Sequence, residues 1–572
     1  MHELIKHPTR SRSKKRVKTG CKTCKARRVK CDESRPVCRR CVSTGRVCDG
    51  YGVWGGGGTP YGQPQSNRAL SIYCTPVPLG SLGREEQAYF DWFMNKTTQK
   101  FAGLFASYFW EILVFQACAD EPAVRHAVVA LSAAHRSDNC YQQWANPATH
   151  GFDAEQFMLQ QYNKAIKYLS ATTVNGNNNS LRIVLITCMI FVTLEYLCGE
   201  YQRGSAHLRS GIQLLSNISS PQARSSISPS VLSPTEDLAH NALIDAYERL
   251  SIQAAMFGHV PSHMCVVARD PQAYAMPYAF SSLVDARQRL DDLLNRIHCL
   301  KCHYYGLSSS KFNTDGREMY EAQRQISADL SLWHKAYDAS LHRIEVDSVR
   351  DAKFGIKILK IYYELVVVMT AVCLSDDEMI FDSYTNKFLT IMTGFVDLWS
   401  YWASLNTHIK DVKDILSDPE SDCDCHGFTV ESGFIPPVYY TGLKCRNPRL
   451  RRQAIRILRA VPHREGVWNG PLLANVLEEV IKIEEDDVYA GDSSSCEPIV
   501  LDGLTAEDLD TPEIKASSRI SDVSVLLPDK VEGDTFMTYH RRVGNHQGEA
   551  FKCKIRRGGS SSSVTRSPFS SS

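Results

Sequence analysis

Six cysteines near the amino terminus have a spacing suited to metal binding. They are Cys21, Cys24, Cys31, Cys38, Cys41 and Cys48. The pattern C-x2-C-x6-C occurs twice, with six residues between the two copies. A C-x2-C pair lets two thiolates meet one metal ion from a tight turn that continues into a helix, and the third cysteine returns after that helix. Each copy therefore offers three sulfurs, one fewer than the tetrahedral set of a structural zinc.

Sharing thiolates between two zinc ions resolves this shortage. Cys21 and Cys38 open the two copies, so their positions favour them as the bridging ligands. We therefore expect two Zn²⁺ ions per chain, held by all six cysteines. The alternative is a disulfide knot, which needs an oxidising compartment. The first twenty residues contain no apolar run typical of a signal peptide, and the loops between the cysteines are strongly basic. Both features favour the metal site.

Charge is unevenly distributed along the chain. The whole sequence has a formal net charge of +2, but residues 1–50 contain sixteen Lys/Arg and four Asp/Glu, a net charge of +12. Residues 51–572 therefore carry a net charge of −10. A basic head on a mildly acidic body indicates a polyanionic partner for the head alone.

The segment TGCKTCKARRVKCDESRPVCRRCVSTGRVCDGY resembles the binuclear zinc-cluster (Zn(2)-C6) DNA-binding domain of fungal transcription factors. All six cysteines match, and Pro36 stands where the family has a proline in the loop between its helices. The resemblance implies a module with two short helices over residues 17–50. It also implies a nuclear, zinc-dependent, sequence-specific transcription factor for RNA polymerase II genes.

The resemblance assigns DNA reading to the end of the first helix, which enters the major groove over a CGG triplet. The family's base-contacting pair falls on Arg27 and Arg28. Arginine donates two hydrogen bonds to O6 and N7 of guanine. The family often has lysine at the second position, so Arg28 is expected to shift the fine base preference. Six other basic residues are expected to contact phosphates: Lys22, Lys25, Lys30, Arg39, Arg40 and Arg46.

Residues 1–16 are predicted to form a disordered basic leader. Its basic cluster extends into the zinc module and fits a nuclear localisation signal and an additional phosphate-binding arm equally well. The cluster consists of Arg12, Lys14, Lys15, Arg16 and Lys18.

Residues 51–83 are predicted to be a flexible Gly/Pro-rich linker. Residues 49–70 contain seven glycines and two prolines, a composition that disfavours both helix and packed core. Many family members have leucine heptads after the cluster that pair two chains on inverted triplets. No such repeat occurs within fifty residues of Cys48. The protein is therefore expected to bind one triplet as a monomer or to form a homodimer through its body.

Residues 84–485 are predicted to form a large all-α domain. Phe90, Phe93, Phe105 and Phe109 recur at helical spacing, and similar patterns follow. The most apolar stretch, residues 183–194, is shorter than the ~20 residues that span a bilayer. HAVVALSAAH, QQYNKAIKYL, FVTLEYLCGEYQRGSAHLRSGIQLL and KCRNPRLRRQAIRILRAVPHREGVWNG resemble the helical regulatory region of fungal zinc-cluster proteins. That resemblance implies modulation of activity, with no catalytic step.

Two other functional classes are less well supported. An enzyme with an appended zinc module would need a catalytic constellation, and none is recognisable. Cys299-x2-Cys302-His303 matches the c-type haem string, and residues 422–426 (DCDCH) contain metal-binding residue types. Their helical or isolated contexts favour ordinary cysteines. A zinc module that binds protein or RNA is disfavoured by the basic first helix.

Two further segments are predicted to be disordered. Residues 216–235 form a Ser/Pro-rich insertion, and residues 486–572 an acidic and then Ser-rich tail. Acidic residues alternate with Val and Leu over residues 484–513, a composition that can form an induced helix on coactivator proteins. Residues 531–557 match none of these patterns.

Overall fold

The computed structural model consists of two units, Met1–Ile72 and Tyr73–Ser572. The structure describes residues 24, 27, 29–32, 38–44, 82–103, 105, 107–143, 151–173, 178–219, 234–258, 275–309, 316–347, 351–405, 427–460, 463–485, 509, 514–528, 533–541, 549–555 and 567–568. The predicted leader, almost all of the linker and most of the 216–235 insertion lie outside these residues. Of the insertion, residues 216–219 and 234–235 belong to helices.

The first unit is organised around cysteines. Cys24, Cys31, Cys38 and Cys41 are buried and form its core, with Val29 packed against them. One short helix, α2 (Arg39–Val42), is described there. A core made of thiols is too small to stabilise a segment of this length by burial alone, so the unit depends on what the thiols bind.

The second unit begins with a group of helices that pack around an apolar core. They are α3 (Arg84–Trp92), the π-helix η1 (Phe93–Thr97), α4 (Thr98–Ala102), the π-helix η2 (Phe109–Leu113), α5 (Val114–Asp120), α6 (Pro122–Gln143), α7 (Gly151–Thr173), α8 (Asn178–Cys198), α9 (Tyr201–Ser219) and α11 (Pro234–Met256). As the helical spacing predicts, Phe90, Phe93, Phe105 and Phe109 are all buried in the main core.

Helix α8 is the apolar centre of this group. Its most apolar part, Ser180–Cys198, is long and apolar enough to cross a membrane by length and composition, so the expectation of too short a segment was wrong. However, 78% of it is buried inside the protein. Helices α6, α7 and α9 all pack against α8, which explains why its sequence is apolar on every side.

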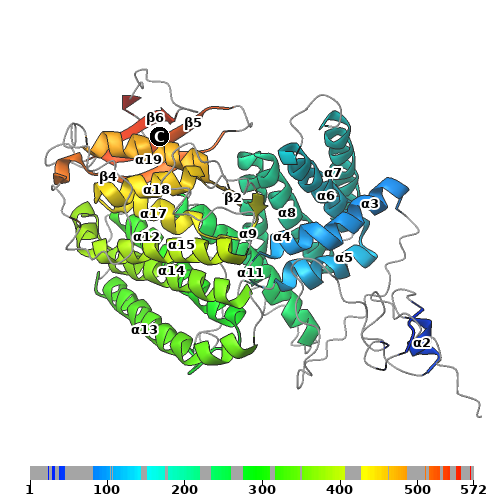
Figure 1. Ribbon diagram of the computed structural model, residues 1–572. Coiled ribbons are helices and arrows are strands. Elements are labelled where there is room, and N and C mark those ends of the chain that lie inside the picture. Colours follow the sequence, from blue (N-terminus) through cyan, green and yellow to red (C-terminus); the bar gives the residue numbers. More distant parts are fainter. Residues whose placement is uncertain are drawn as a thin grey trace, which may run out of the picture. The chain divides into compact units, whose positions relative to one another are not determined.

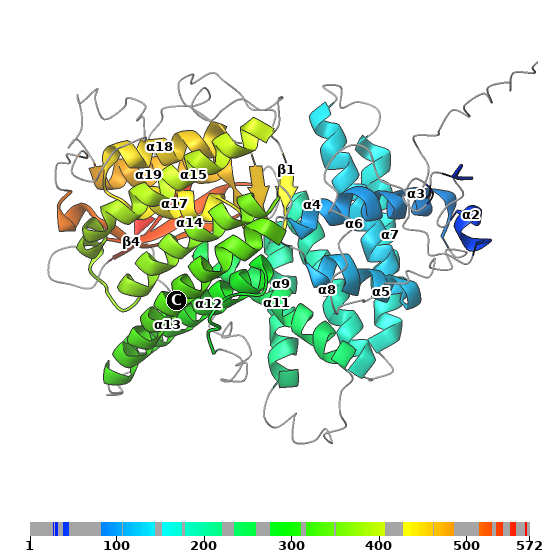
Figure 2. The ribbon, with the colours of Figure 1, turned by 60° about the horizontal axis from the view of Figure 1, so that its bottom comes forward.

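The second group of helices continues the body. It contains α12 (Leu283–Ser309), α13 (Gly316–Asp347), α14 (Asp351–Val372), the 3-10 helix η4 (Glu378–Tyr384), α15 (Thr385–Leu405), α17 (Ile435–Lys444), α18 (Pro448–Ala460) and α19 (Gly470–Glu485). Figures 1 and 2 both show α12 to α15 lying side by side, and helices adjacent along the chain pack together. The fully buried Trp333 of α13 donates its indole N–H to the Ala286 carbonyl of α12 at 2.8 Å.

The body is mostly helical but also contains two small sheets, which corrects the all-α prediction. In the first, β1 (Gly427–Thr429) pairs parallel to β2 (His463–Glu465), which pairs antiparallel to β3 (Trp468–Asn469). The second sheet is antiparallel, in the order β4 (Ile520–Leu526), β5 (Thr535–Arg541), β6 (Glu549–Ile555) and β7 (Ser567–Pro568). This sheet occupies part of residues 486–572, which the sequence analysis assigned to a largely disordered tail (Figure 1).

The carboxy-terminal sheet is ordered because one of its faces is buried. In β5 the side chains of Thr535, Met537 and Tyr539 are buried and alternate with more exposed residues, as in a strand with one face on a core. Helix α19 packs against β4 and β6. Residues 531–557, for which the sequence analysis had no account, thus supply two strands of this sheet.

Two residues at the start of the acidic 484–513 segment lie in the core at the end of α19. Glu484 is fully buried and bridges Arg446 Nη2 at 2.7 Å and Arg451 Nη2 at 2.5 Å. Glu484 Oε1 also accepts the backbone N–H of Ile520 at 3.0 Å, which attaches β4 to the helix. The neighbouring Glu485 bridges Arg452 at 2.8 Å. Burial raises the pKa of Glu484, but Arg446 and Arg451 outweigh burial and lower it to about 2.

Glu484→Gln is expected to lower the free energy of unfolding of the body by roughly 3–5 kcal/mol, because it leaves two buried guanidinium groups undercompensated. Since the folded-state pKa is depressed from 4.5, this contribution is complete above about pH 4.5 and disappears as the pH falls toward 2. Urea unfolding followed by circular dichroism measures the change.

The matched control is Glu478→Gln on the same helix. Glu478 pairs with Arg459 at 2.6 Å, but both side chains are about half exposed. This variant should change the stability by less than about 1 kcal/mol. Equal effects of the two substitutions would show that the buried pairing of Glu484 does not stabilise the body.

Candidate zinc and DNA-binding site

The described cysteines bring their sulfur atoms together at distances suited to a shared metal ion. Cys24 Sγ lies 3.6 Å from Cys38 Sγ and 3.8 Å from Cys41 Sγ. Two thiolates bound tetrahedrally to one zinc at about 2.3 Å are separated by roughly 3.8 Å. The four described cysteines of this unit, Cys24, Cys31, Cys38 and Cys41, are all buried. The donor set and its spacing therefore fit zinc.

Cys38 belongs to two such groups. In the first group, the sulfurs of Cys38, Cys24 and Cys41 lie within 4.8 Å of one another. In the second group, the sulfurs of Cys38 and Cys31 and a carboxylate oxygen of Asp32 also lie within 4.8 Å of one another. A thiolate that contacts both groups has the position required of a bridging ligand. Cys21, the other predicted bridge, and Cys48 lie outside the described residues.

Helix α2 and the residues before it hold Cys38 and Cys41 in place. The Asp32 carboxylate accepts the backbone N–H of Arg39 and of Arg40, each at 3.0 Å. Cys38 Sγ accepts the backbone N–H of Cys41 at 3.3 Å. An N–H donor directed at the sulfur favours its thiolate form, and the carboxylate satisfies donors at the start of the helix. The sequence analysis missed the role of Asp32, although an acidic residue directly after the third cysteine of a basic segment was a visible signal.

The predicted DNA-contacting residues are only partly described. Lys30, Arg39 and Arg40 have exposed side chains, as a phosphate contact requires. Arg27 is half-buried, and its Nη1 donates to Thr44 Oγ1 at 3.2 Å. The other predicted contacts lie outside the described residues: Lys22, Lys25, Arg28, Arg46 and the localisation cluster Arg12, Lys14, Lys15, Arg16 and Lys18.

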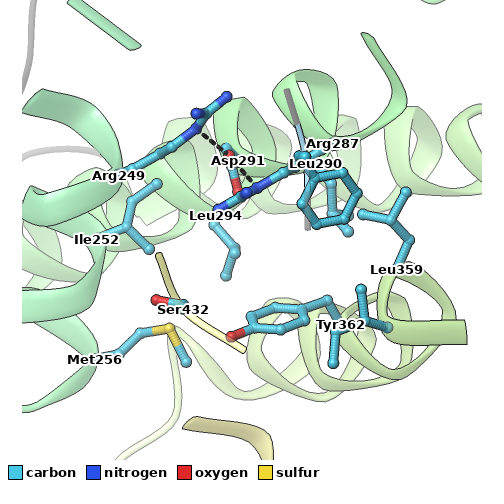
Figure 3. A pocket seen from close by; sticks show the side chains of 12 residues that line it. Arg249, Ile252, Met256, Arg287, Leu290, Asp291, Leu294, Leu359, Tyr362 and Ser432 are labelled. Carbon is cyan, nitrogen blue, oxygen red and sulfur yellow. Dashed lines mark hydrogen bonds and ion pairs between the residues drawn. The ribbon is translucent and has the colours of Figure 1, made fainter. Parts of the chain in front are cut away.

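The body contains a small cavity that we considered as a second candidate site. It is lined by residues of α11, α12 and α14, with Phe105 and Ser432, and its volume is about 30 Å³ (Figure 3). Its charged groups pair with one another: Arg249 lies 3.4 Å from Asp291 and 3.5 Å from Glu431, and Arg287 also pairs with Glu431. Burial raises the pKa of Glu431, but Arg287 and Arg249 bring it below its usual range. A polar cavity of this size accommodates one or two water molecules, not an organic effector.

The sequence analysis considered two other motifs that contain metal-binding residue types, and the structure describes only one of them. Cys299, Cys302 and His303 lie within the long helix α12, where Cys299 and Cys302 are half-buried. Residues 422–426 lie outside the described part of the chain.

Two family models match the chain. Residues 19–53 match the fungal Zn(2)-Cys(6) binuclear cluster domain, and residues 89–247 match the fungal specific transcription factor domain. Both matches are to domains of fungal transcription factors. This confirms the resemblance that the sequence analysis drew from the cysteine pattern and the helical strings.

Relatives of this chain are fungal transcription regulators. The aspercryptin biosynthesis cluster-specific transcription regulator atnN of Emericella nidulans is 32% identical over 218 residues, which are 35% of this chain and 35% of that protein. Transcription regulator lscL of Purpureocillium lilacinum is 27% identical over 207 residues, 33% of this chain and 46% of that protein. The transcriptional regulatory protein moc3 of Schizosaccharomyces pombe is 54% identical over 44 residues, 8% of this chain and 9% of that protein.

These matches have a limited extent. The chain spans about a third of the length of the first of these relatives and just under half of the second. No solved structure matches the chain. The matched families and relatives are regulators of transcription rather than enzymes, which agrees with the absence of an enzyme function in the sequence analysis.

Removing zinc should unfold residues 17–50 and abolish DNA binding, because metal and fold form together in a segment with so little core. We expect chelation to release about two zinc ions per chain while most helicity of the body persists. Metal analysis, circular dichroism and a DNA-binding assay on the same sample measure these three quantities. Unchanged DNA affinity after complete removal of zinc would contradict the assignment of the site.

Proposed function

We propose that this protein is a nuclear, zinc-dependent transcription regulator that binds DNA sequence-specifically through residues 17–50. The observation that carries the proposal is the cluster of Cys24, Cys38 and Cys41 sulfurs at zinc-ligand spacing, within a segment that matches the fungal binuclear cluster domain. The body then regulates or positions this module, in keeping with the match of residues 89–247 to the fungal regulatory domain.

The cysteines would hold two zinc ions as a structural cluster. All six cysteines would be ligands, and Cys21 and Cys38 would bridge the two ions. Zinc supplies a tetrahedral cross-link without redox chemistry. Six thiolates and two Zn²⁺ sum to a charge of −2, which the surrounding Lys and Arg side chains offset.

Base reading and phosphate binding fall to different basic residues in this proposal. Arg27 and Arg28 would donate to guanines of a CGG triplet in the major groove. The exposed Lys30, Arg39 and Arg40 support a phosphate-contacting role, since such contacts position a module without reading sequence. Lys22, Lys25 and Arg46 complete this group. The basic cluster from Arg12 to Lys18 would direct nuclear import.

Coactivator proteins are the proposed partners of the acidic segment. The part of residues 484–513 that we propose to bind them is shorter than the sequence analysis suggested. Glu484 and Glu485 bind arginines in the core, and Leu509 is buried, so these residues are unsuited to an induced helix on a coactivator. The segment available for such binding is therefore residues 486–508.

Arg27→Ala and Arg28→Ala should each weaken binding to a CGG-containing duplex by roughly 1–3 kcal/mol and relax the preference for its guanines. Arg39→Ala should instead weaken binding to all duplexes alike and reduce the salt dependence, because a phosphate contact carries no base information. Binding titrations against matched and mutated triplets at several salt concentrations separate the two effects. Altered base preference in Arg39→Ala but not in Arg28→Ala would reverse the assigned roles.

Residues 1–70 are expected to bind one CGG triplet as a monomer, because the glycine-rich segment after Cys48 cannot fix the distance between two modules. The full chain gains affinity on paired triplets only if the body forms a homodimer, and it then tolerates varied spacing and orientation. Gel shifts with paired triplets at different spacings measure this tolerance. A sharp optimum at one spacing for residues 1–70 would reveal a pairing element near the cluster.

A further inference from the structure

One hydrogen bond connects the two halves of the zinc module through a residue assigned to base reading. Arg27, three residues after the second cysteine, donates its Nη1–H to Thr44 Oγ1 at 3.2 Å. Thr44 lies seventeen residues further along the chain, just after α2. The bond therefore joins the first cysteine repeat to the second.

In its contact with Arg27, the Thr44 hydroxyl acts as the hydrogen-bond acceptor. It lies 2.9 Å from the Arg40 carbonyl oxygen and 3.1 Å from the Cys41 carbonyl oxygen, and it donates its single proton toward them. Its lone pairs remain to accept the Arg27 N–H, because a guanidinium group is a donor and never an acceptor. The carbonyls of α2 thus orient the hydroxyl that orients the arginine.

This contact leaves most of the guanidinium available for DNA. A guanidinium group carries five N–H donors in a fixed plane, and a guanine needs two of them. One bond to Thr44 restricts the long side chain without using that pair. A side chain already restricted before binding loses less conformational entropy on contact with a base.

We propose that Thr44 is a positioning residue for Arg27 and thereby sets the specificity for guanine. The inference rests on the proposed function, namely the reading of a guanine-containing triplet by Arg27. It adds that this reading depends on a threonine outside the basic helix. Asp32, which caps α2, supports the same arrangement from the other end of that helix.

The test uses the full-length, zinc-loaded protein. The measured quantity is the ratio of dissociation constants for a duplex in which the CGG guanines are replaced and for the CGG duplex. Thr44→Val removes the hydroxyl but keeps the branched shape, and Thr44→Ser keeps the hydroxyl. Zinc content is measured for each variant. If Thr44→Val binds less zinc, Thr44→Ala replaces it and the same ratio decides.

We expect Thr44→Val to reduce the specificity ratio by roughly three- to tenfold, the effect of freeing one long side chain. Affinity for unrelated duplexes should stay unchanged, and Thr44→Ser should restore the ratio. In an Arg27→Ala background, Thr44→Val should have no further effect, because the two residues act as one unit.

Three results would overturn the inference. The first is an unchanged ratio in zinc-loaded Thr44→Val while Arg27→Ala lowers it, which leaves the proposed function intact. The second is an increased ratio in Thr44→Val, which would mean that the bond withholds Arg27 from DNA. The third is a wild-type protein that binds CGG and altered duplexes equally, which removes the proposed function together with the inference.

Discussion

The number of cysteine sulfurs is the main constraint on the amino-terminal module. Each of its two cysteine repeats supplies three thiolates, whereas a structural zinc takes four ligands. In the proposed cluster Cys38 would resolve part of this shortage, since its sulfur belongs both to the group with Cys24 and Cys41 and to the group with Cys31. Among the described residues of this unit, four cysteines and Val29 form the core. The positions of Lys30, Arg39 and Arg40 therefore follow from the arrangement of the cysteines.

The residues that would position the proposed DNA-contacting arginines lie close to the cysteines in the chain. Asp32 follows the third cysteine and caps α2, while Cys41 starts the turn that carries Thr44. Arg27 meets Thr44 only because the two repeats are folded against each other. In the proposed function, metal binding and base recognition are therefore coupled through short-range hydrogen bonds within one small segment.

The sequence predicted the features that depend on regular residue spacing. The cysteine spacing indicated the zinc ligands, and helical spacing placed Phe90, Phe93 and Phe109 in the core. Contacts between distant residues were not predictable in this way. The pairing of Glu484 with Arg446 and Arg451 depends on how α18 and α19 pack, so the sequence analysis included this acidic residue in a segment expected to bind coactivators. The carboxy-terminal sheet was missed because its strands have one partly polar face and are held by distant parts of the chain, such as α19 and the Gly258 carbonyl that accepts from Ser524.

The central claim is that six thiolates share two zinc ions, with Cys38 as one of the bridges. X-ray absorption spectroscopy at the zinc edge, combined with the zinc-to-protein ratio of the full chain, tests it most directly. The account predicts about two zincs per chain, each surrounded by four sulfurs at about 2.3 Å, a combination that six cysteines can provide only by bridging. One zinc per chain, or nitrogen and oxygen neighbours in place of a fourth sulfur, would contradict it.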